Sequence, residues 1–173
     1  DPTVEVGLTD LGREQAAAAR GALVGRGFDL AIHTRFPRTA ETLAIVLQGR
    51  HVPRAIYPQL DDVHLGMFEG RPVEEYRAWR AEHTPHDPPP GEGESRVDAL
   101  YRYMTGFERM LAEDADHVLA ILHDVPIRFL LNGSLGADPL DGPVTQVDNA
   151  DISLFDDLMI ERALDAFRER LGH

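Results

Sequence analysis

Four short apolar runs, held apart by stretches of helical character, most constrain what this chain can fold into. They are FDLAIHT (28–34), RAIYP (54–58), HVLAILH (117–123) and ADISLF (150–155). Strands that are separated by helices join a sheet through crossover connections rather than through tight hairpins. The alternation therefore predicts one α/β domain over residues 1–173, in which helices cover a mainly parallel sheet.

The stretches between the first runs carry helix signals. The hydroxyl group of Thr9 can cap a helix within residues 10–27. Pro37 suits the first turn of a helix over residues 37–50. A third helix is expected to begin near Val73.

A proline- and glycine-rich loop over residues 84–95 precedes the longest predicted helix. Ser95 can cap this helix. Its apolar residues recur at helical spacing and should form one buried face: Val97, Leu100, Tyr101, Met104, Phe107 and Leu111. Two more helices are predicted over residues 125–136 and 159–171.

The composition excludes several classes of site and partner. All 17 basic residues are arginine and there is no cysteine, which rules out a lysine Schiff base, a lysine phosphate loop and a thiol nucleophile. The net charge of −13 argues against nucleic acids and anionic membranes as partners. No apolar run approaches the ~20 residues that span a bilayer, and no signal peptide is evident, so we expect a cytoplasmic protein.

His123 and Asp124 stand at the end of the most apolar predicted strand, just before a helix. Sheets of α/β proteins bind ligands at the carboxyl ends of their strands. The two residues are therefore either a satisfied structural pair, in which Asp124 pairs with a neighbouring arginine, or part of a functional site, which Asp124 and Arg128 beside His123 favour.

Two more segments follow predicted strands in the same way. Arg38 falls at the start of a helix, where free N–H groups and the arginine fork suit an anion such as phosphate; a solvated surface arginine is the alternative. Asp61 and Asp62 lie in the loop after the second strand, where a buried carboxyl group could donate a proton; an ordinary turn is the alternative.

A metal site has weaker support. His83, His86 and Asp87 are of metal-ligand type, but they lie in a proline-rich loop without rigid backing, so we expect no metal there.

Six motifs, in this order, resemble those of the histidine phosphatase superfamily, which includes the cofactor-dependent phosphoglycerate mutases. They are LTDLGREQA (8–16), HTRFPRTAET (33–42), LDDVHLGMFEG (60–70), PPPGEGES (88–95), ILHDVPIR (121–128) and DNADISLF (148–155). The resemblance implies a three-layer α/β/α sandwich of the phosphoglycerate mutase type. Arg38 and Thr42 fall on the arginine and threonine positions of the second motif. His33 and Thr34 replace its usual pair of small hydroxyl residues.

The resemblance also implies a chemistry that requires no metal or cofactor. In this family a histidine nitrogen attacks phosphorus, arginines and a second histidine hold the phosphoryl oxygens, and a carboxylic acid protonates the leaving oxygen. Arg38 then binds phosphate, His123 is the second histidine, and Thr9 is a further substrate contact. Asp62, where the family usually has glutamate, is the implied proton donor. Asp124 is a second candidate acid, because the acid phosphatase branch uses an aspartate there and the mutases have glycine.

The nucleophile of the family lies in an arginine–histidine–glycine motif at the end of a first strand. None of the eight histidines of this chain has that context. We expect this strand and its loop, on the order of 10–20 residues, to precede Asp1. A relative that lacks the nucleophile is the alternative.

The leading hypothesis is a phosphomonoesterase that hydrolyses a small phosphorylated metabolite through a phosphohistidine intermediate. It is favoured because the acid loop, the LDDVHLGMFEG segment (60–70), is short and carries no added basic residues that could hold a bisphosphate. A 2,3-bisphosphoglycerate-dependent phosphoglycerate mutase and a non-catalytic protein that binds a phosphorylated ligand are the alternatives. The expected partner is a small phosphorylated substrate, and the resemblance allows a homodimer.

Overall fold

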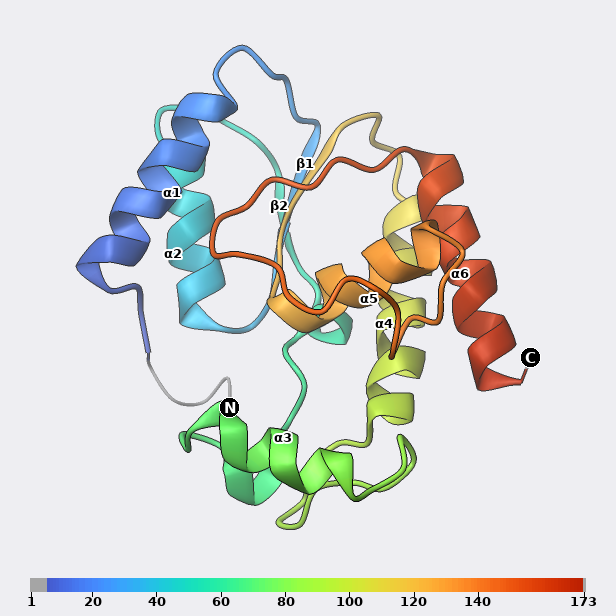
Figure 1. Ribbon diagram of the computed structural model, residues 1–173. Helices are drawn as coiled ribbons and strands as arrows, with labels where there is room; N and C mark the ends of the chain where they lie inside the picture. Colours follow the sequence, from blue (N-terminus) through green and yellow to red (C-terminus); the bar gives the residue numbers. More distant parts are fainter. Residues whose placement is uncertain (1–5, 173) are drawn as a thin grey trace.

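Three parallel strands form the sheet of the computed structural model, which describes residues 6–172 (Figure 1). The strands are β1 (Leu30–His33), β2 (Arg54–Ile56) and β3 (Val118–Ile121), in the order β2-β1-β3. The register places Ala31 of β1 opposite Arg54 and Leu119. The first three predicted strands and their parallel arrangement are therefore confirmed, each slightly shorter than predicted.

Helices follow the strands as the alternation predicts. They are α1 (Asp10–Ala22), α2 (Pro37–Val46), α3 (Val73–Ala81), α4 (Arg96–Leu111), α5 (Asp124–Ser134) and α6 (Asp157–Leu171), with short 3-10 turns η1 (Pro58–Leu60) and η2 (Gly66–Phe68). Both predicted caps are confirmed, because Thr9 accepts a hydrogen bond from the Gly12 amide at 3.1 Å and Ser95 accepts one from the Asp98 amide at 3.0 Å. No helix within residues 6–172 has the length and apolar character needed to cross a membrane.

The sheet lies between two helical layers, as expected for a three-layer α/β/α sandwich (Figure 1). Side chains alternate between the faces of a strand. Ala31 therefore packs against Leu43 and Leu47 on the α2 side, where α1 lies outside α2. Ile32 points the other way and joins a core that includes Phe107 of α4, together with side chains of α5 and α6.

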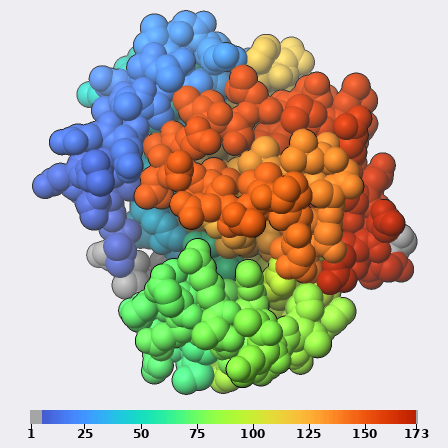
Figure 2. Space-filling view, viewed as in Figure 1, coloured from blue at the N-terminus to red at the C-terminus, as the bar shows by residue number. Residues whose placement is uncertain are grey.

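The segment around α3 forms a lobe beside the carboxyl ends of the strands (green in Figure 2). The loop that carries Met67 and the loop that carries Pro90 pack closely within this lobe, because the Met67 amide donates to the Pro90 carbonyl at 2.7 Å. Gly66 has a φ of 57°, and a Cβ atom there would lie 2.3 Å from the Pro90 oxygen. Only glycine fits this close approach, so the glycine of the LDDVHLGMFEG motif has a packing role.

Two predictions are wrong. Residues 150–155 form no strand, because Ala150 adopts a φ of 58° in a turn and no neighbouring strand pairs with this segment within the described chain. Tyr101 is 53% exposed and does not belong to the buried face of α4. Each residue turns a helix by about 100°, so the residue after Leu100 falls on the flank of the buried stripe.

Candidate active site

The carboxyl ends of β1 and β3 bring Arg38 and His123 together. His123 lies two residues after the end of β3, at the start of α5, and its side chain is only 3% exposed. Its Nδ1 atom lies 3.0 Å from Nη2 of Arg38, at the start of α2. Its Nε2 atom lies 2.8 Å from Oγ1 of Thr34, just after β1. Both ring nitrogens of the buried histidine are therefore satisfied.

This geometry fixes the protonation state of the His123 ring. A guanidinium group can only donate hydrogen bonds, so Nδ1 must accept and the single ring proton lies on Nε2. Nε2 then donates to Thr34, whose hydroxyl group can donate to Thr39 at 3.0 Å. Burial, helped by the positive charge of Arg38, lowers the pKa of His123 to about 3. The imidazole is therefore neutral at physiological pH.

Phe36 holds the ring and the guanidinium group in place. Its ring meets the His123 ring edge-on, with centroids 4.7 Å apart, and it is 5% exposed. The Cζ atom of Arg38 lies 4.3 Å from the centre of the same ring. Such cation–π contacts contribute about 0.5–2 kcal/mol, so Phe36 limits the movement of both groups.

Asp62 completes the cluster. One of its carboxylate oxygens lies 3.1 Å from Arg38 Nη2 and 3.6 Å from His123 Nδ1. Burial raises the pKa of the Asp62 carboxyl group, and the positive charge of Arg38 offsets part of the rise. The negative charge of Asp124 raises the pKa further. The side chain keeps 31% exposure, so it can reach a ligand at the surface of the cluster.

Asp61 turns the other way. Its carboxylate accepts hydrogen bonds from the Arg35 amide at 2.9 Å and from Arg35 Nε at 2.6 Å. The Asp61 side chain is 6% exposed. Asp61 therefore fixes the loop after β1, whereas its neighbour Asp62 faces the cluster.

Asp124 ties α5 to a distant loop. One carboxylate oxygen accepts a hydrogen bond from the Val147 amide at 2.7 Å, and the other lies 3.5 Å from Arg128. Arg128 in turn donates to the Thr145 carbonyl at 2.7 Å. The structural pairing that the sequence offered as an alternative for Asp124 is thus present, next to the cluster.

The remaining sequence candidates lie outside this cluster. Thr9 caps α1, and within residues 6–172 no hydrogen bond joins it to Arg38 or His123. Its role as a substrate contact stays a prediction. Three residues proposed from their ligand type do not form a metal-binding group in the described chain: His83, His86 and Asp87.

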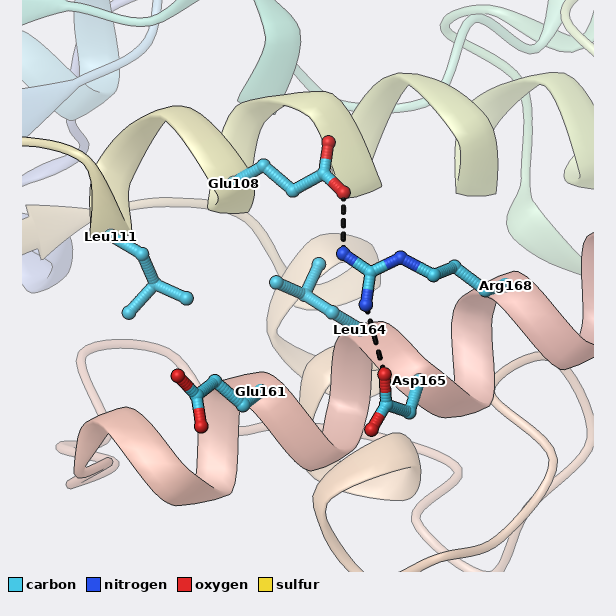
Figure 3. A pocket seen from close by; sticks show the side chains of 6 residues that line it. All are labelled: Glu108, Leu111, Glu161, Leu164, Asp165 and Arg168. Atoms are coloured by element: carbon cyan, nitrogen blue, oxygen red, sulfur yellow. Dashed lines mark hydrogen bonds and ion pairs between the residues drawn. The ribbon is translucent and has the colours of Figure 1, made fainter. Parts of the chain in front are cut away.

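A cavity of about 220 Å³ opens beside the acid loop. Its lining residues are Arg35, Phe36, Pro58, Asp61, Asp62, Val63, His64, Glu94 and Arg102. A larger groove of about 360 Å³ lies between α4 and α6, but it contains none of the clustered groups (Figure 3). The smaller cavity shares Phe36 and Asp62 with the cluster, so the candidate active site is the cluster together with this adjoining cavity.

The sequence analysis assigned no role in the site to four residues that shape it: Thr34, Phe36, Glu94 and Arg102. Thr34 lies in the quoted HTRFPRTAET motif, and its hydroxyl group was the available signal. Arg102 binds Glu94 eight positions earlier, but its contacts with the Gln59 and Asp61 carbonyl groups run to residues more than 40 positions earlier, and no local pattern could reveal those.

Comparisons with known proteins show which family this chain resembles. The family model of the histidine phosphatase superfamily (branch 1) matches residues 2–158. The adenosylcobalamin/alpha-ribazole phosphatase of Salmonella typhimurium strain LT2 is 27% identical over 136 residues, which cover 72% of this chain and 65% of that protein. The protein of the same name from Escherichia coli strain K12 is 27% identical over 141 residues, which cover 75% of this chain and 67% of that protein.

A solved structure supports the fold. The alpha-ribazole phosphatase from Shigella flexneri superposes with a TM-score of 0.72 at 24% sequence identity, over 84% of this chain and 77% of that one. The match to the family model extends over most of the chain, including the segments that carry Arg38, Asp62 and His123. The chain therefore belongs to the histidine phosphatase superfamily, branch 1.

Proposed function

We propose that this protein is a phosphomonoesterase that hydrolyses a small phosphorylated metabolite through a phosphohistidine intermediate. The observation that carries the proposal is the contact of the buried, neutral His123 with Arg38, 3.0 Å apart, with Asp62 beside both. A cation, a neutral imidazole and a carboxyl group with a raised pKa are the groups that phosphoryl transfer and leaving-group protonation need.

Arg38 and His123 bind the phosphoryl oxygens in this proposal. The Arg38 side chain is 36% exposed, so N–H groups other than the one bound to His123 can reach a ligand. A bound phosphoryl group brings negative charge next to the imidazole, which raises the pKa of His123 above its value in the empty site. The ring can then take a proton and donate it to a phosphoryl oxygen.

Asp62 is the proposed proton donor. Its raised pKa keeps more of it protonated than an ordinary aspartate, and it stands next to Arg38. Asp124 is engaged with the Val147 amide and with Arg128, which leaves it less free to approach a leaving group. These contacts favour Asp62 over Asp124.

The reaction needs a nucleophilic histidine, which the resemblance places on a further strand. In the first step a P–N bond forms, the ester P–O bond breaks and Asp62 protonates the leaving oxygen. Water then attacks phosphorus and gives a proton to the Asp62 carboxylate, the P–N bond breaks, and inorganic phosphate and the free histidine are released.

The proposal names a class of substrate, small phosphorylated metabolites, and not a single compound. Two relatives that are 27% identical are named adenosylcobalamin/alpha-ribazole phosphatases, which supports phosphatase activity and makes alpha-ribazole 5′-phosphate one member of a test panel. The chain covers about two thirds of the length of these relatives, so the panel should also hold sugar phosphates, nucleotides and phosphoglycerates.

Release of inorganic phosphate by the full-length protein tests the proposal. We expect at least one ester in the panel to be hydrolysed by the wild type, and its hydrolysis to be strongly weakened in Arg38→Gln. A parallel assay follows interconversion of 2- and 3-phosphoglycerate with a bisphosphate primer. Interconversion without net hydrolysis would favour the mutase. Phosphate binding without any turnover would favour the non-catalytic alternative.

A further inference from the structure

The segment that carries Asp62 has little regular structure of its own. It follows the short turn η1 and continues without helix or strand up to η2. A catalytic carboxyl group has to be held within about 0.5 Å of its productive position. Something outside the segment must therefore fix the backbone on both sides of Asp62.

Arg102 on α4 supplies part of that support. Its Nη1 atom donates to the carbonyl oxygens of Gln59 and Asp61, both at 2.9 Å. Its Nη2 atom lies 3.4 Å from the carbonyl oxygen of Asp62 itself. α4 is a firm anchor, because the neighbouring side chain of Tyr103 is fully buried. The Arg102 side chain thus joins the carbonyl groups of Gln59, Asp61 and Asp62 to a core helix.

Glu94 fixes the guanidinium group from the other side. Its two carboxylate oxygens accept from Arg102 Nε at 2.8 Å and from Nη2 at 2.6 Å, a two-pronged contact that lysine cannot reproduce. The Glu94 amide also donates to the His64 carbonyl at 2.8 Å. The side chains of Arg102 and Glu94 are 25% and 19% exposed, so solvent screens their attraction only in part.

We infer that Arg102 and Glu94 are positioning residues for proton donation by Asp62. Arg102 contacts the backbone of Asp62 and not its carboxyl group, and Glu94 in turn holds Arg102; together they set where the Asp62 carboxyl group stands. The inference rests on the proposed function, since it assigns a support to the acid of that reaction. Breaking the two-pronged contact between Arg102 and Glu94 should therefore slow reactions that need an acid and spare those that do not.

The leaving group separates these two kinds of step. Without an acid, the leaving group of an alkyl phosphate would be an unstable alkoxide. The leaving group of p-nitrophenyl phosphate is p-nitrophenolate, a stable anion that needs no proton. For Arg102→Lys we expect kcat with the alkyl phosphate to fall about 10-fold or more, while kcat with p-nitrophenyl phosphate changes by less than about threefold. Glu94→Gln should show the same pattern more weakly. In an Asp62→Asn background, Arg102→Lys should not widen the difference between the two substrates.

Arg168→Lys is a matched control. Arg168 also joins two carboxylates, Glu108 of α4 at 2.7 Å and Asp165 at 2.9 Å, in the groove between α4 and α6 (Figure 3). We expect this variant to lower both rates by the same small factor, or neither. An equal loss with the two substrates in Arg102→Lys and in Glu94→Gln would overturn the inference.

A titration followed by carbon NMR of the Asp62 carboxyl group provides a readout that does not need turnover. We expect its pKa to move toward that of an ordinary aspartate in Arg102→Lys, because a loosened loop admits water, and to stay unchanged in Arg168→Lys. An unchanged pKa in Arg102→Lys and Glu94→Gln would contradict the inference. If the wild type hydrolyses no ester, the proposed function fails, and this titration still decides whether Arg102 fixes Asp62.

Discussion

The Nδ1 atom of His123 accepts a hydrogen bond from Nη2 of Arg38 across 3.0 Å. Since the guanidinium group cannot accept, protonation of His123 requires this bond to break or to be replaced. A phosphoryl oxygen that enters between the two groups would accept from both. The contact therefore links phosphate binding to the protonation of a buried histidine.

Arg38→Gln should lower kcat/KM for a hydrolysed ester by about 10- to 100-fold, because a charge-assisted hydrogen bond contributes about 1.5–3 kcal/mol. The measurement is steady-state phosphate release. Arg77→Gln, which removes an exposed arginine of α3, serves as the control and should leave kcat/KM unchanged. Equal effects of the two variants would show that Arg38 acts only through general charge.

Asp62→Asn and Asp124→Asn should differ in their dependence on leaving group. We expect Asp62→Asn to lower kcat with an alkyl phosphate by about 100-fold or more and to affect p-nitrophenyl phosphate far less. Activity of the wild type should fall as pH rises through the pKa of Asp62, which burial places above that of an ordinary aspartate, and this limb should be absent in Asp62→Asn. The opposite ranking of the two variants would make Asp124 the acid.

Thr34→Val removes the acceptor of the His123 ring proton while keeping the shape of the side chain. The buried Nε2–H group loses its partner, so we expect unfolding in urea to become easier by about 1–3 kcal/mol. Hydrolysis should also weaken, because the ring is less well oriented. Thr105→Val is the control, since the Thr105 hydroxyl group bonds only to its own helix at the Arg102 carbonyl. A neutral Thr34→Val variant would show that the contact between Thr34 and His123 does not stabilise the fold.

The lowered pKa of His123 predicts a pH dependence of stability. Between about pH 6.5, the pKa of an unfolded histidine, and about pH 3, the unfolded chain binds a proton that the folded chain does not. Stability should therefore fall as pH drops through this window, by about 2–3 kcal/mol between pH 7 and pH 4.5. The raised pKa of Asp62 acts in the opposite direction, so the measurement is made in an Asp62→Asn background.

The check is urea unfolding of Asp62→Asn with and without His123→Gln. The double variant should lose less stability on acidification, by the amount assigned to His123. Parallel pH dependences in the two proteins would mean that His123 takes up a proton in the folded state.

The sequence allowed the parallel sheet and the meeting of Arg38, Asp62 and His123 to be predicted, because carboxyl ends of parallel strands gather at one edge. The strand predicted over residues 150–155 fails, since a strand requires a neighbour and apolar composition alone does not supply one. The support that Arg102 gives to the Asp62 segment escaped prediction because it depends on contacts with carbonyl groups about 40 residues earlier. Asp61 and Asp62 are adjacent and of the same residue type, so only the folded structure shows that Asp61 binds Arg35 whereas Asp62 binds Arg38.

The binding of inorganic phosphate, followed through the ring nitrogens of His123 by NMR, tests the central claim most directly. We expect a saturable shift of both ring nitrogen signals in the wild type, with a gain of ring protonation, and binding weakened at least about 10-fold in Arg38→Gln. If the His123 signals do not respond to phosphate, or respond equally in Arg38→Gln, the cluster is not a phosphoryl site.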